Sequence, residues 1–522
     1  MDRPNVLFLM SDEHNHRFLG RRDEPSAPVR TPTLDGLAES GTDFTDTYCP
    51  VPLCAPSRKC LMAGKEAQHA EAWDNQTVVE PHHRTLPEVF TERDYGTCLV
   101  GKMHFQGTRQ FNGFEHRPYG DLTGHGVQQP GHQPDPISPE ELDVQPRRQA
   151  IEFGTRIPSA GVTEIPESML QEQVVARETI AWLREHRARS EDPWFLCASF
   201  SRPHFPLTAP RRHFERYWPD NVPDPVVGRE GDTTDHPLTR AKLDRERTDE
   251  YDDRTLERAR AAYLACVDYL DEVLGELLGT LDDDGFLDNT VVVYVSDHGD
   301  LAGEHGLWWK NSWHEGSVRV PMMVQVPEHR RGEAHAGEIS TPASLLDIYP
   351  TLCELAGFEP PEAVDGVSLA DAITDGVEPD RGPVFCDNFV PPYNDDALAY
   401  RVVRDGRYKY VGFSDAPELL FDLEADPHEQ DNLAVDPTEE QAAVRSDLRE
   451  TVAETVDFDE VERARDDYAE TYAQYELPVP PGTGNSYLMP DGRLVDATTP
   501  LYKPDVLAED PSRVFEDFPG DT

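Results

Sequence analysis

The stretch Asn5–Asn15, NVLFLMSDEHN, places five consecutive apolar residues, Val6–Met10, directly before two acidic ones. A short apolar run bounded by polar residues is typical of a strand that is buried on both faces of a sheet. We interpret it as such a strand and not as a secretory signal, because acidic residues follow it at once. This interpretation favours a cytoplasmic protein whose fold begins with a buried strand.

Further strand-like runs alternate with amphipathic helical stretches along most of the chain. The runs are TCLVG (97–101), WFLCASF (194–200), TVVVYVSD (290–297) and VPMMVQVP (320–327), and the helical stretches cover residues 33–41, 85–95, 169–188 and 255–281. This alternation predicts an α/β fold, an α/β/α sandwich with a mainly parallel central sheet. In such sheets ligands bind beyond the carboxyl ends of the strands.

The length of 522 residues favours more than one domain. We expect a large α/β domain over residues 1–378 and a smaller α+β domain over 379–476. The stretch ALAYRVVRDGRYKYVGF (397–413) alternates like an antiparallel hairpin with an Asp-Gly turn, which predicts an antiparallel sheet in the second domain. Residues 477–522 read as an extended tail that could wrap over the body or over a neighbouring subunit, so a homo-oligomer stays open.

Two stretches of the large domain look irregular. Residues 106–166 are rich in Pro, Gly, His and Gln, and residues 219–253 are polar and charged. Long irregular insertions in a compact domain are usually functional loops or surface. The first insertion is therefore either a lid over a site or a plain surface loop.

The chain is strongly acidic, with 100 Asp and Glu against 48 Lys and Arg and a formal net charge of −52. Its acidic residues are spread along the whole length. Such a surface repels itself in dilute buffer, whereas at about 1 M salt the Debye length falls to roughly 3 Å. We interpret the charge as that of a halophilic protein. The absence of a basic stripe disfavours nucleic acid as a partner, and no apolar run is long enough for a membrane span.

The eight cysteines show no paired spacing, which argues against a disulfide framework. Cys54 differs from the others because LCAPSRKC (53–60) places a proline two residues and an arginine four residues after it. We expect the chain to turn at Cys54 and to begin a helix near Pro56. The thiol would then lie at the positive end of a helix. Apolar contexts favour small buried side chains for Cys98, Cys197, Cys266 and Cys353.

Polar pairs follow two of the predicted strands. Asp12-Glu13 comes after the first strand, and Asp297-His298 comes after the run at 290–297. Burying carboxylates is costly unless a cation neutralises them. Oxygen donors suit Ca²⁺ or Mg²⁺, and an imidazole admits Mn²⁺ or Zn²⁺. Helix capping would explain either pair alone equally well, but the two pairs together favour a divalent metal site.

Cationic residues follow the other strands. Lys102 and His104 come after 97–101, His204 comes after 194–200, and Lys310 lies downstream of Asp297. The chain has only seven lysines, so two of them at strand ends are informative. Together with a metal, these residues would form a cationic cradle for a tetrahedral oxyanion such as sulfate or phosphate.

These motifs resemble those of the sulfatase family, which has an alkaline-phosphatase-like fold. Cys54–Arg58 matches the signature Cys-x-Pro-x-Arg, and GKMHF (101–105) is similar to the Gly-Lys-x-His element of the family. The stretches TPTLDGLAESG (31–41), DIYPTLCELAG (347–357) and FDLEADPHEQDNLA (421–434) also resemble family segments. The resemblance covers nearly the whole chain.

The resemblance implies a sulfuric ester hydrolase that acts on a sulfated sugar, an aryl sulfate or choline sulfate. In this family a maturation enzyme oxidises the motif cysteine to formylglycine, an aldehyde whose hydrate attacks sulfur. One divalent metal ion is implied, with Ca²⁺ preferred over Mg²⁺ or Mn²⁺. The metal ligands implied are Asp12, Glu13, Cys54, Asp297 and His298. The catalytic residues implied are Cys54, Arg58 for the diol oxygen, Lys102 and Lys310 for the sulfate, His104 as base and His204 as acid.

Two features depart from the commonest sulfatase pattern, namely Asp-Glu at Asp12-Glu13 and Asp-His at Asp297-His298. The Asp-His form resembles iduronate sulfatase, choline sulfatase and phosphonate monoester hydrolase members. A phosphonate monoester hydrolase or phosphodiesterase therefore stays an alternative, as does a non-catalytic binder of oxyanions or sulfated glycans if Cys54 is unconverted. Three tryptophans near Lys310 could contact a sugar or a quaternary ammonium, or could simply pack: Trp308, Trp309 and Trp313.

Overall fold

The computed structural model describes residues 3–473 and three short strands in the tail. It leaves out residues 23, 25, 26, 76, 106–108, 110, 119–155, 164, 229–235, 362 and 390–397, and in the tail it describes only 486–488, 494–496 and 501–502. Most of the predicted insertion 106–166, and with it the lid hypothesis, lies outside the described residues. The predicted domain boundaries at 378 and 476 stay predictions.

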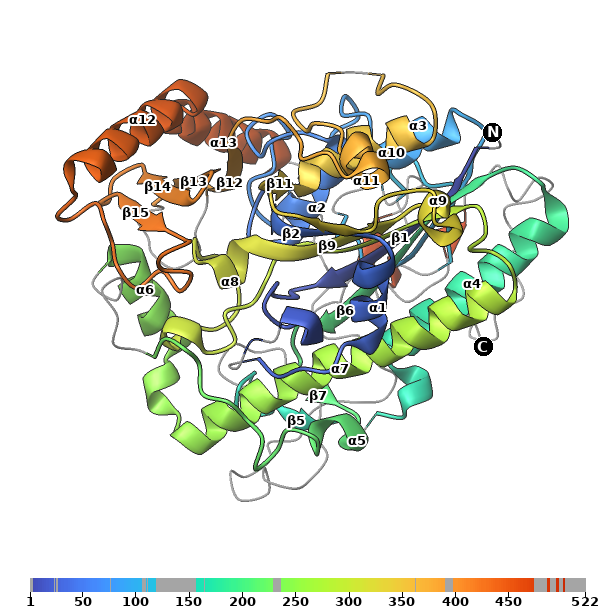
Figure 1. The fold of residues 1–522 in the computed structure, drawn as a ribbon, viewed down its shortest axis with the longest axis horizontal. Coiled ribbons are helices and arrows are strands. Elements are labelled where there is room, and N and C mark those ends of the chain that lie inside the picture. The colour runs from blue at the N-terminus through green and yellow to red at the C-terminus, as the bar shows by residue number, and fades with distance from the viewer. Residues whose placement is uncertain are drawn as a thin grey trace.

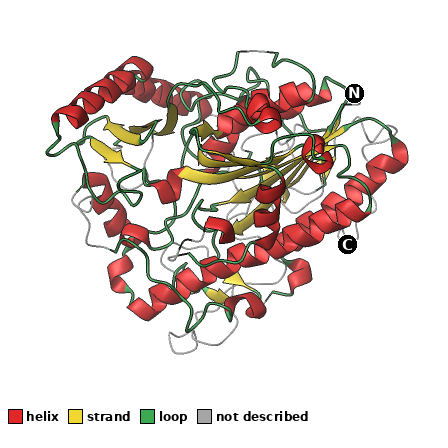
Figure 2. Ribbon diagram, viewed as in Figure 1, coloured by secondary structure: helices red, strands yellow, loops and turns green. Residues whose placement is uncertain are grey.

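A ten-stranded sheet forms the centre of the molecule (Figures 1 and 2). Among the described strands of this sheet only β9 and β18 run against the others, so the sheet is mainly parallel, as predicted. The first strand, β1, lies between β6 and β8, in register with residues far along the chain. In order, the strands are β10 (Gly337–Ile339), β2 (Thr42–Tyr48), β9 (Arg319–Gln325), β8 (Thr290–Ser296), β1 (Asn5–Asp12), β6 (Trp194–Pro203), β3 (Gly96–Gly101), β4 (His116–Arg117) and β18 (Leu501–Tyr502), while β11 (Ala343–Ser344) also pairs with β2.

Helices cover both faces of this sheet because its strands are apolar on both sides. Along β1, Val6, Phe8 and Met10 contribute to one core and Leu7 and Leu9 to the other. The first core packs under α2 (Cys54–Ala63), α3 (Leu86–Thr91), α10 (Ile348–Leu355) and α11 (Ala370–Asp375). The second packs under α1 (Pro32–Ser40), α4 (Gln171–Arg189) and α7 (Asp253–Asp283).

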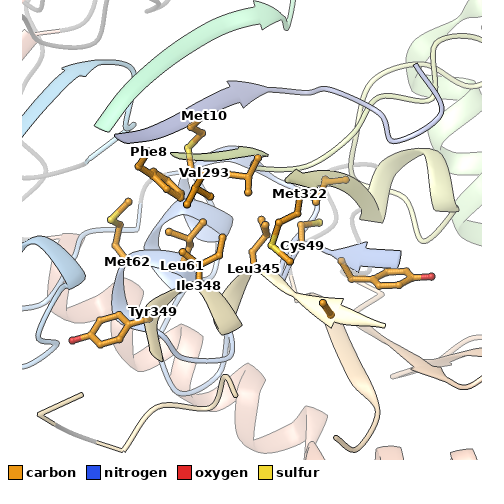
Figure 3. Packing of buried hydrophobic residues seen from close by; sticks show 14 of the residues in the cluster. Phe8, Met10, Cys49, Leu61, Met62, Val293, Met322, Leu345, Ile348 and Tyr349 are labelled. Atoms are coloured by element: carbon orange, nitrogen blue, oxygen red, sulfur yellow. The ribbon is translucent and has the colours of Figure 1, made fainter. Parts of the chain in front are cut away.

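Helix α2 is anchored to the sheet by apolar contacts along its length. Figure 3 shows Leu61 and Met62 of α2 in one cluster with Phe8 and Met10 of β1 and Val293 of β8. All of these side chains are buried. The contacts hold the helix against the two strands that carry the predicted carboxylates, so they fix where its N-terminus points.

A separate four-stranded antiparallel sheet follows in the chain, as predicted for the C-terminal part. Its hairpin turns directly after Asp405, where Gly406 has a φ of 51°. A buried ion pair between Lys409 and Glu315, 2.8 Å long, joins this sheet to the segment before β9. Its elements are β12 (Val384–Asn388), β13 (Tyr400–Asp405), β14 (Tyr408–Phe413) and β15 (Leu419–Asp422), followed by α12 (Glu439–Thr455) and α13 (Phe458–Ala473).

The stretch 219–253, predicted as irregular, contains the helix α6 (Pro237–Glu246). This helix forms although its sequence is polar, because Lys242 and Glu246 form a buried pair four residues apart and His236 caps its first turn. In the tail, β18 pairs with β4 and so joins the edge of the central sheet. The remaining elements are α5 (Arg211–Phe214), α8 (Glu315–Val318), α9 (Pro327–Arg331), β5 (Gly161–Val162), β7 (Thr208–Ala209), β16 (Ser486–Leu488) and β17 (Leu494–Asp496).

Within the described part of the chain, no helix combines the length and the apolar character that crossing a bilayer would require. All eight cysteines are buried and free, in agreement with the expectation that the chain has no disulfide framework.

Candidate active site

Cys54 lies at the first position of α2, with Leu53 as the N-cap residue. The helix thus begins two residues earlier than predicted, because a proline in the first turn costs no helical hydrogen bond and Pro56 is tolerated at the third position. The Cys54 side chain is almost completely buried, at 1% exposure. It therefore faces the interior at the positive end of the helix dipole.

Three cationic side chains surround the sulfur of Cys54. The Sγ atom lies 3.0 Å from Lys310 Nζ, 3.2 Å from His298 Nε2 and 3.9 Å from Lys102 Nζ. Burial alone would raise the pKa of the Cys54 thiol, but the charges of Lys102, Lys310 and His298 and a hydrogen bond from His104 lower it well below its ordinary value. The pocket therefore favours negative charge at residue 54.

Arg58 lies one turn after Cys54 and ties four strand ends together. Its Nε donates to Asp297 Oδ2 at 2.7 Å, and its Nη2 lies 3.2 Å from Asp12 Oδ2. Its Nη1 donates to the Lys102 carbonyl at 2.6 Å and to Ser199 Oγ at 3.0 Å. Because the guanidinium is fully buried, these contacts hold the ends of β1, β3, β6 and β8 in one place.

Asp12, Cys54, Asp297 and His298 each offer a ligand atom, and all four atoms lie within 4.8 Å of one another. The carboxylates and the imidazole are completely buried. His298 Nδ1 lies 3.0 Å from the Gly299 carbonyl, which turns Nε2 toward the other ligand atoms. Two carboxylates and an oriented imidazole are donors that fit a divalent cation.

Glu13 lies beside this group and faces a different set of partners. Its Oε2 is 3.2 Å from Lys310 Nζ and 3.5 Å from His204 Nε2, and among the described residues its buried Oε1 has no hydrogen-bond partner. Burial raises the pKa of Glu13 to about 8, although Lys310 opposes the shift. The ligand atoms of Asp12, Glu13 and His204 form a second group that could hold a cation.

His204 closes the pocket on the side of Glu13. Its backbone N–H donates to the Asp12 carbonyl at 3.0 Å, and its Nδ1 lies 2.7 Å from the Phe205 carbonyl. The proton therefore lies on Nδ1, and Nε2 faces the pocket without one. Burial lowers the pKa of His204 to about 3, and the charges of Lys310 and Lys102 add to the shift.

The structure thus brings together all the residues that the sequence predicts for the site. The catalytic and metal-binding roles of these residues stay predictions. Lys102 pairs with Asp12 Oδ2 and is buried. The sequence does not predict Ser199, since this residue lies inside an apolar strand and gives no signal in the sequence. The same holds for Tyr263, which comes from α7 and donates to the Glu13 carbonyl at 2.7 Å.

The three tryptophans near Lys310 are buried, at 2% exposure or less. Trp313 packs edge-on against Phe413 of the C-terminal sheet, with ring centroids 5.5 Å apart. Trp309 contacts the Phe205 ring at 5.4 Å, and Lys310 Nζ lies 5.7 Å from that ring. Packing explains Trp308 and Trp313, while Trp309 and Phe205 form an aromatic pair beside the pocket.

Comparison with known proteins shows which family models and relatives the chain matches. The sulfatase family model matches residues 4–358, and the model of the C-terminal region of N-sulphoglucosamine sulphohydrolase matches residues 303–457. The chain is 36% identical over 445 residues to a choline-sulfatase of Rhizobium meliloti, covering 83% of each chain. It is 28% identical over 443 residues to an arylsulfatase of Clostridium perfringens, covering 83% of this chain and 90% of that one.

Solved structures agree in fold. A phosphonate monoester hydrolase of Agrobacterium radiobacter superposes with a TM-score of 0.72 at 24% identity, covering 96% of this chain and 100% of the other. A protein solved in complex with its substrate D-glucosamine-2-N,6-O-disulfate superposes with a TM-score of 0.68 at 21% identity, covering 89% of this chain and 99% of the other. With the family model matching more than half of its length, the chain belongs to the sulfatase family of sulfuric ester hydrolases.

Proposed function

We propose that the protein hydrolyses a sulfate monoester to an alcohol and sulfate, with residue 54 as the nucleophile after its conversion to formylglycine by a maturation enzyme. The observation that carries the proposal is the position of Cys54. It lies buried at a helix N-terminus, with Lys310, His298 and Lys102 within 4 Å of its sulfur. The sulfur marks the place that the hydrate oxygens of formylglycine would take.

Asp12, Asp297, His298 and residue 54 would hold a divalent metal ion, with Glu13 as a further ligand and Ca²⁺ preferred for the carboxylates. When bound, this ion supplies positive charge that lowers the pKa of a hydroxyl at residue 54. Arg58 keeps the two aspartates oriented, since its guanidinium contacts both, and it would also support the diol oxygen.

The reaction would proceed by a displacement at sulfur, followed by an elimination at residue 54. One hydroxyl of the hydrate loses its proton to solvent and its oxygen attacks sulfur, the ester S–O bond breaks, and the alcohol leaves with a proton from the acid. Lys102 and Lys310 bind the sulfuryl oxygens during this step, because both ammonium groups face residue 54. His104 then accepts the proton of the second hydroxyl, the aldehyde forms again, and sulfate leaves. Addition of water to the aldehyde restores the hydrate.

His204 is the proposed acid that protonates the leaving alcohol, and Lys310 is the alternative candidate for this role. In the structure Nε2 of His204 faces the pocket without a proton, whereas Lys310 carries its positive charge 3.0 Å from Cys54 Sγ. A negatively charged substrate between the two lysines would offset their effect on His204 and favour its protonation.

The substrate class rests on the aromatic pair beside the pocket. The guanidinium carbon of Arg156 lies 3.5 Å from the centroid of the Phe205 ring and 5.5 Å from that of Trp309. A cation already occupies the aromatic face that a quaternary ammonium group would need. We therefore propose a sulfated sugar or another hydroxyl-rich or anionic ester as the substrate and rank choline sulfate second. An Arg156→Gln variant would then gain in the ratio of kcat/KM for choline sulfate to that for a sulfated sugar.

A phosphonate or phosphate ester hydrolase remains the second candidate function. The observation that favours it is a 28% identity over 491 residues to a multifunctional protein of the alkaline phosphatase superfamily from Trinickia caryophylli. The ratio of kcat/KM for an aryl sulfate to that for an aryl phosphonate separates the two. A ratio above one supports the sulfatase, and a ratio far below one would replace it.

Mass spectrometry of protein isolated from its native host tests the proposal directly. The tryptic peptide of residues 31–58 contains both Cys49 and Cys54, so Cys49 is an internal control that should stay a thiol. We expect residue 54 alone to show the mass loss of a thiol-to-aldehyde conversion. A free thiol at both positions in active protein would contradict the proposed nucleophile, and in inactive protein it would favour a binder of oxyanions.

A further inference from the structure

A second group of metal-ligand side chains lies outside the active site, on the segment between α2 and α3. Glu71 Oε2 lies 3.6 Å from His82 Nε2 and 3.8 Å from His83 Nε2. The two imidazole rings are neighbours, with centroids 4.1 Å apart. Glu71, His82 and His83 thus direct one oxygen and two nitrogens toward a common point, with all three ligand atoms within 4.8 Å of one another.

The spacing of these atoms suits a shared ion better than direct hydrogen bonds. N–H···O hydrogen bonds in proteins are about 2.7–3.2 Å long, so both contacts to the Glu71 carboxylate are too long. Two ligand atoms that are each ~2.0 Å from a tetrahedral metal ion are roughly 3.3 Å apart. Small movements of the exposed His82 and Glu71 side chains would bring the three atoms to that spacing.

His83 supplies an independent observation. Its side chain is 2% exposed, and neither of its ring nitrogens makes a hydrogen bond of standard geometry among the described residues, although the Ala70 backbone contacts the ring. Leaving a buried polar group without a partner costs about 1–3 kcal/mol, so such groups call for an explanation. Simple packing of a neutral imidazole would leave this cost uncompensated, whereas a metal bond to one nitrogen would remove it.

The backbone around Glu71 is held in place. Glu71 has a φ of 52°, which is unusual for a residue with a side chain, and its carbonyl accepts a hydrogen bond from Lys59 Nζ of α2 at 3.1 Å. Lys59 thus bonds to the Glu71 backbone and leaves the carboxylate directed at the histidines. The side chain of Glu71 is 40% exposed and that of His82 is 65% exposed, so solvent reaches the group.

We infer that Glu71, His82 and His83 form a binding site for a divalent transition-metal ion of the Zn²⁺ type, with water in the remaining position. Two imidazoles and one carboxylate are the donors that such ions prefer. A bound ion would tie the segment before α3 to the segment after α2. The inference does not depend on the proposed reaction.

Zinc binding by the full-length protein tests this site. The protein is equilibrated with excess Ca²⁺ to compete with zinc for the active site, and its zinc affinity and stoichiometry are measured by competition with a chromophoric chelator. We expect one zinc ion per chain and a loss of at least tenfold in affinity for His82→Ala, which removes an exposed ligand and leaves the fold intact. His69→Ala is the matched control, because His69 is an exposed histidine of the same segment that pairs with Asp365 instead.

Three results would overturn the inference. One is that the wild-type protein binds no zinc under these conditions. Another is that His82→Ala binds zinc as tightly as wild type, which would place the ion at another site. The third is an equal loss of affinity in His69→Ala, which would show a general effect of surface histidines. Retention of one zinc ion by wild type and His69→Ala, together with its loss from His82→Ala, would establish the site.

Discussion

At the scale of single residues, His204 and Lys310 face the same pocket but carry their protons differently. His204 Nδ1 contacts the Phe205 carbonyl, which leaves Nε2 as the only ring atom that could donate to a leaving alcohol. If His204 donates that proton, the variant His204→Ala loses kcat/KM about 10²–10⁴-fold on esters with poor leaving groups. Esters with good leaving groups need no acid, so they should react almost normally.

The measurement is kcat/KM for a series of aryl sulfates whose phenols differ in pKa, for wild type, His204→Ala and Lys310→Ala. A steeper dependence on leaving-group pKa in His204→Ala identifies His204 as the acid. An equal loss on all esters in His204→Ala, with the steeper dependence in Lys310→Ala, would transfer this role to Lys310.

The polar residues that follow apolar strands could be predicted from the sequence, because each of them ends a recognisable run of apolar residues. Asp12, Asp297 and Lys102 could be found in this way. Ser199 could not, because it lies inside an apolar strand and its hydroxyl contacts the Arg58 guanidinium, which another element brings to it. The ring tautomer of His204 likewise depends on a carbonyl whose direction no sequence pattern predicts.

At the scale of elements, α6 depends on one histidine. The Leu238 N–H donates to His236 Nδ1 at 3.3 Å, and His236 Nε2 donates to the Pro417 carbonyl at 3.0 Å. The contact with Leu238 needs the neutral ring, because a protonated Nδ1 cannot accept a hydrogen bond, and burial lowers the pKa of His236 to about 4. Protonation of His236 would therefore remove the cap of the helix.

The sign of the pH effect follows from this shift. The folded-state pKa of about 4 lies below the unfolded value near 6.5, so the unfolded state binds more protons between these values. Stability is lost as the pH falls from 6.5 to 4, by at most about 3 kcal/mol from His236. The variant His236→Asn keeps a capping side chain but cannot titrate, so its stability should fall less over this range.

Denaturant unfolding of wild type and His236→Asn between pH 4 and 7.5 measures the effect. His335→Asn is a control, since His335 is exposed on the surface. Parallel pH curves for wild type and His236→Asn would contradict the role of His236.

The helices and strands could be predicted from the sequence where their apolar residues follow a simple pattern. The apolar runs identified β1, β3, β6, β8 and β9, but not the direction of β9. That strand is antiparallel to both of its neighbours because the segment that joins it to β8 is a long loop and not a crossover helix. Strand β2, TDFTDTY, escaped prediction because its residues are half polar.

At the scale of the whole molecule, the net charge of −52 predicts that the stability of the fold depends on salt. Screening of the mutual repulsion should raise the melting temperature steeply between low salt and about 1 M KCl, where the Debye length is ~3 Å. Above this concentration the rise should level off, whereas an effect of surface exclusion would continue to grow. Thermal unfolding at increasing KCl, with sucrose as an uncharged control, distinguishes the two. A melting temperature that stays constant or falls over this range would contradict the halophilic interpretation.

The central position of β1 in the sheet has a consequence for the synthesis of the protein on the ribosome. Asn5 pairs with Thr290, so after its synthesis β1 must wait for a partner that is made some 285 residues later. At 5–20 residues per second this delay is on the order of 15–60 s, during which the apolar run Val6–Met10 has no neighbour on that side. The acidic nascent chain around it would repel other chains of its kind for that interval. The negative charge would then keep unfinished chains apart during synthesis, before it has any effect on the folded protein.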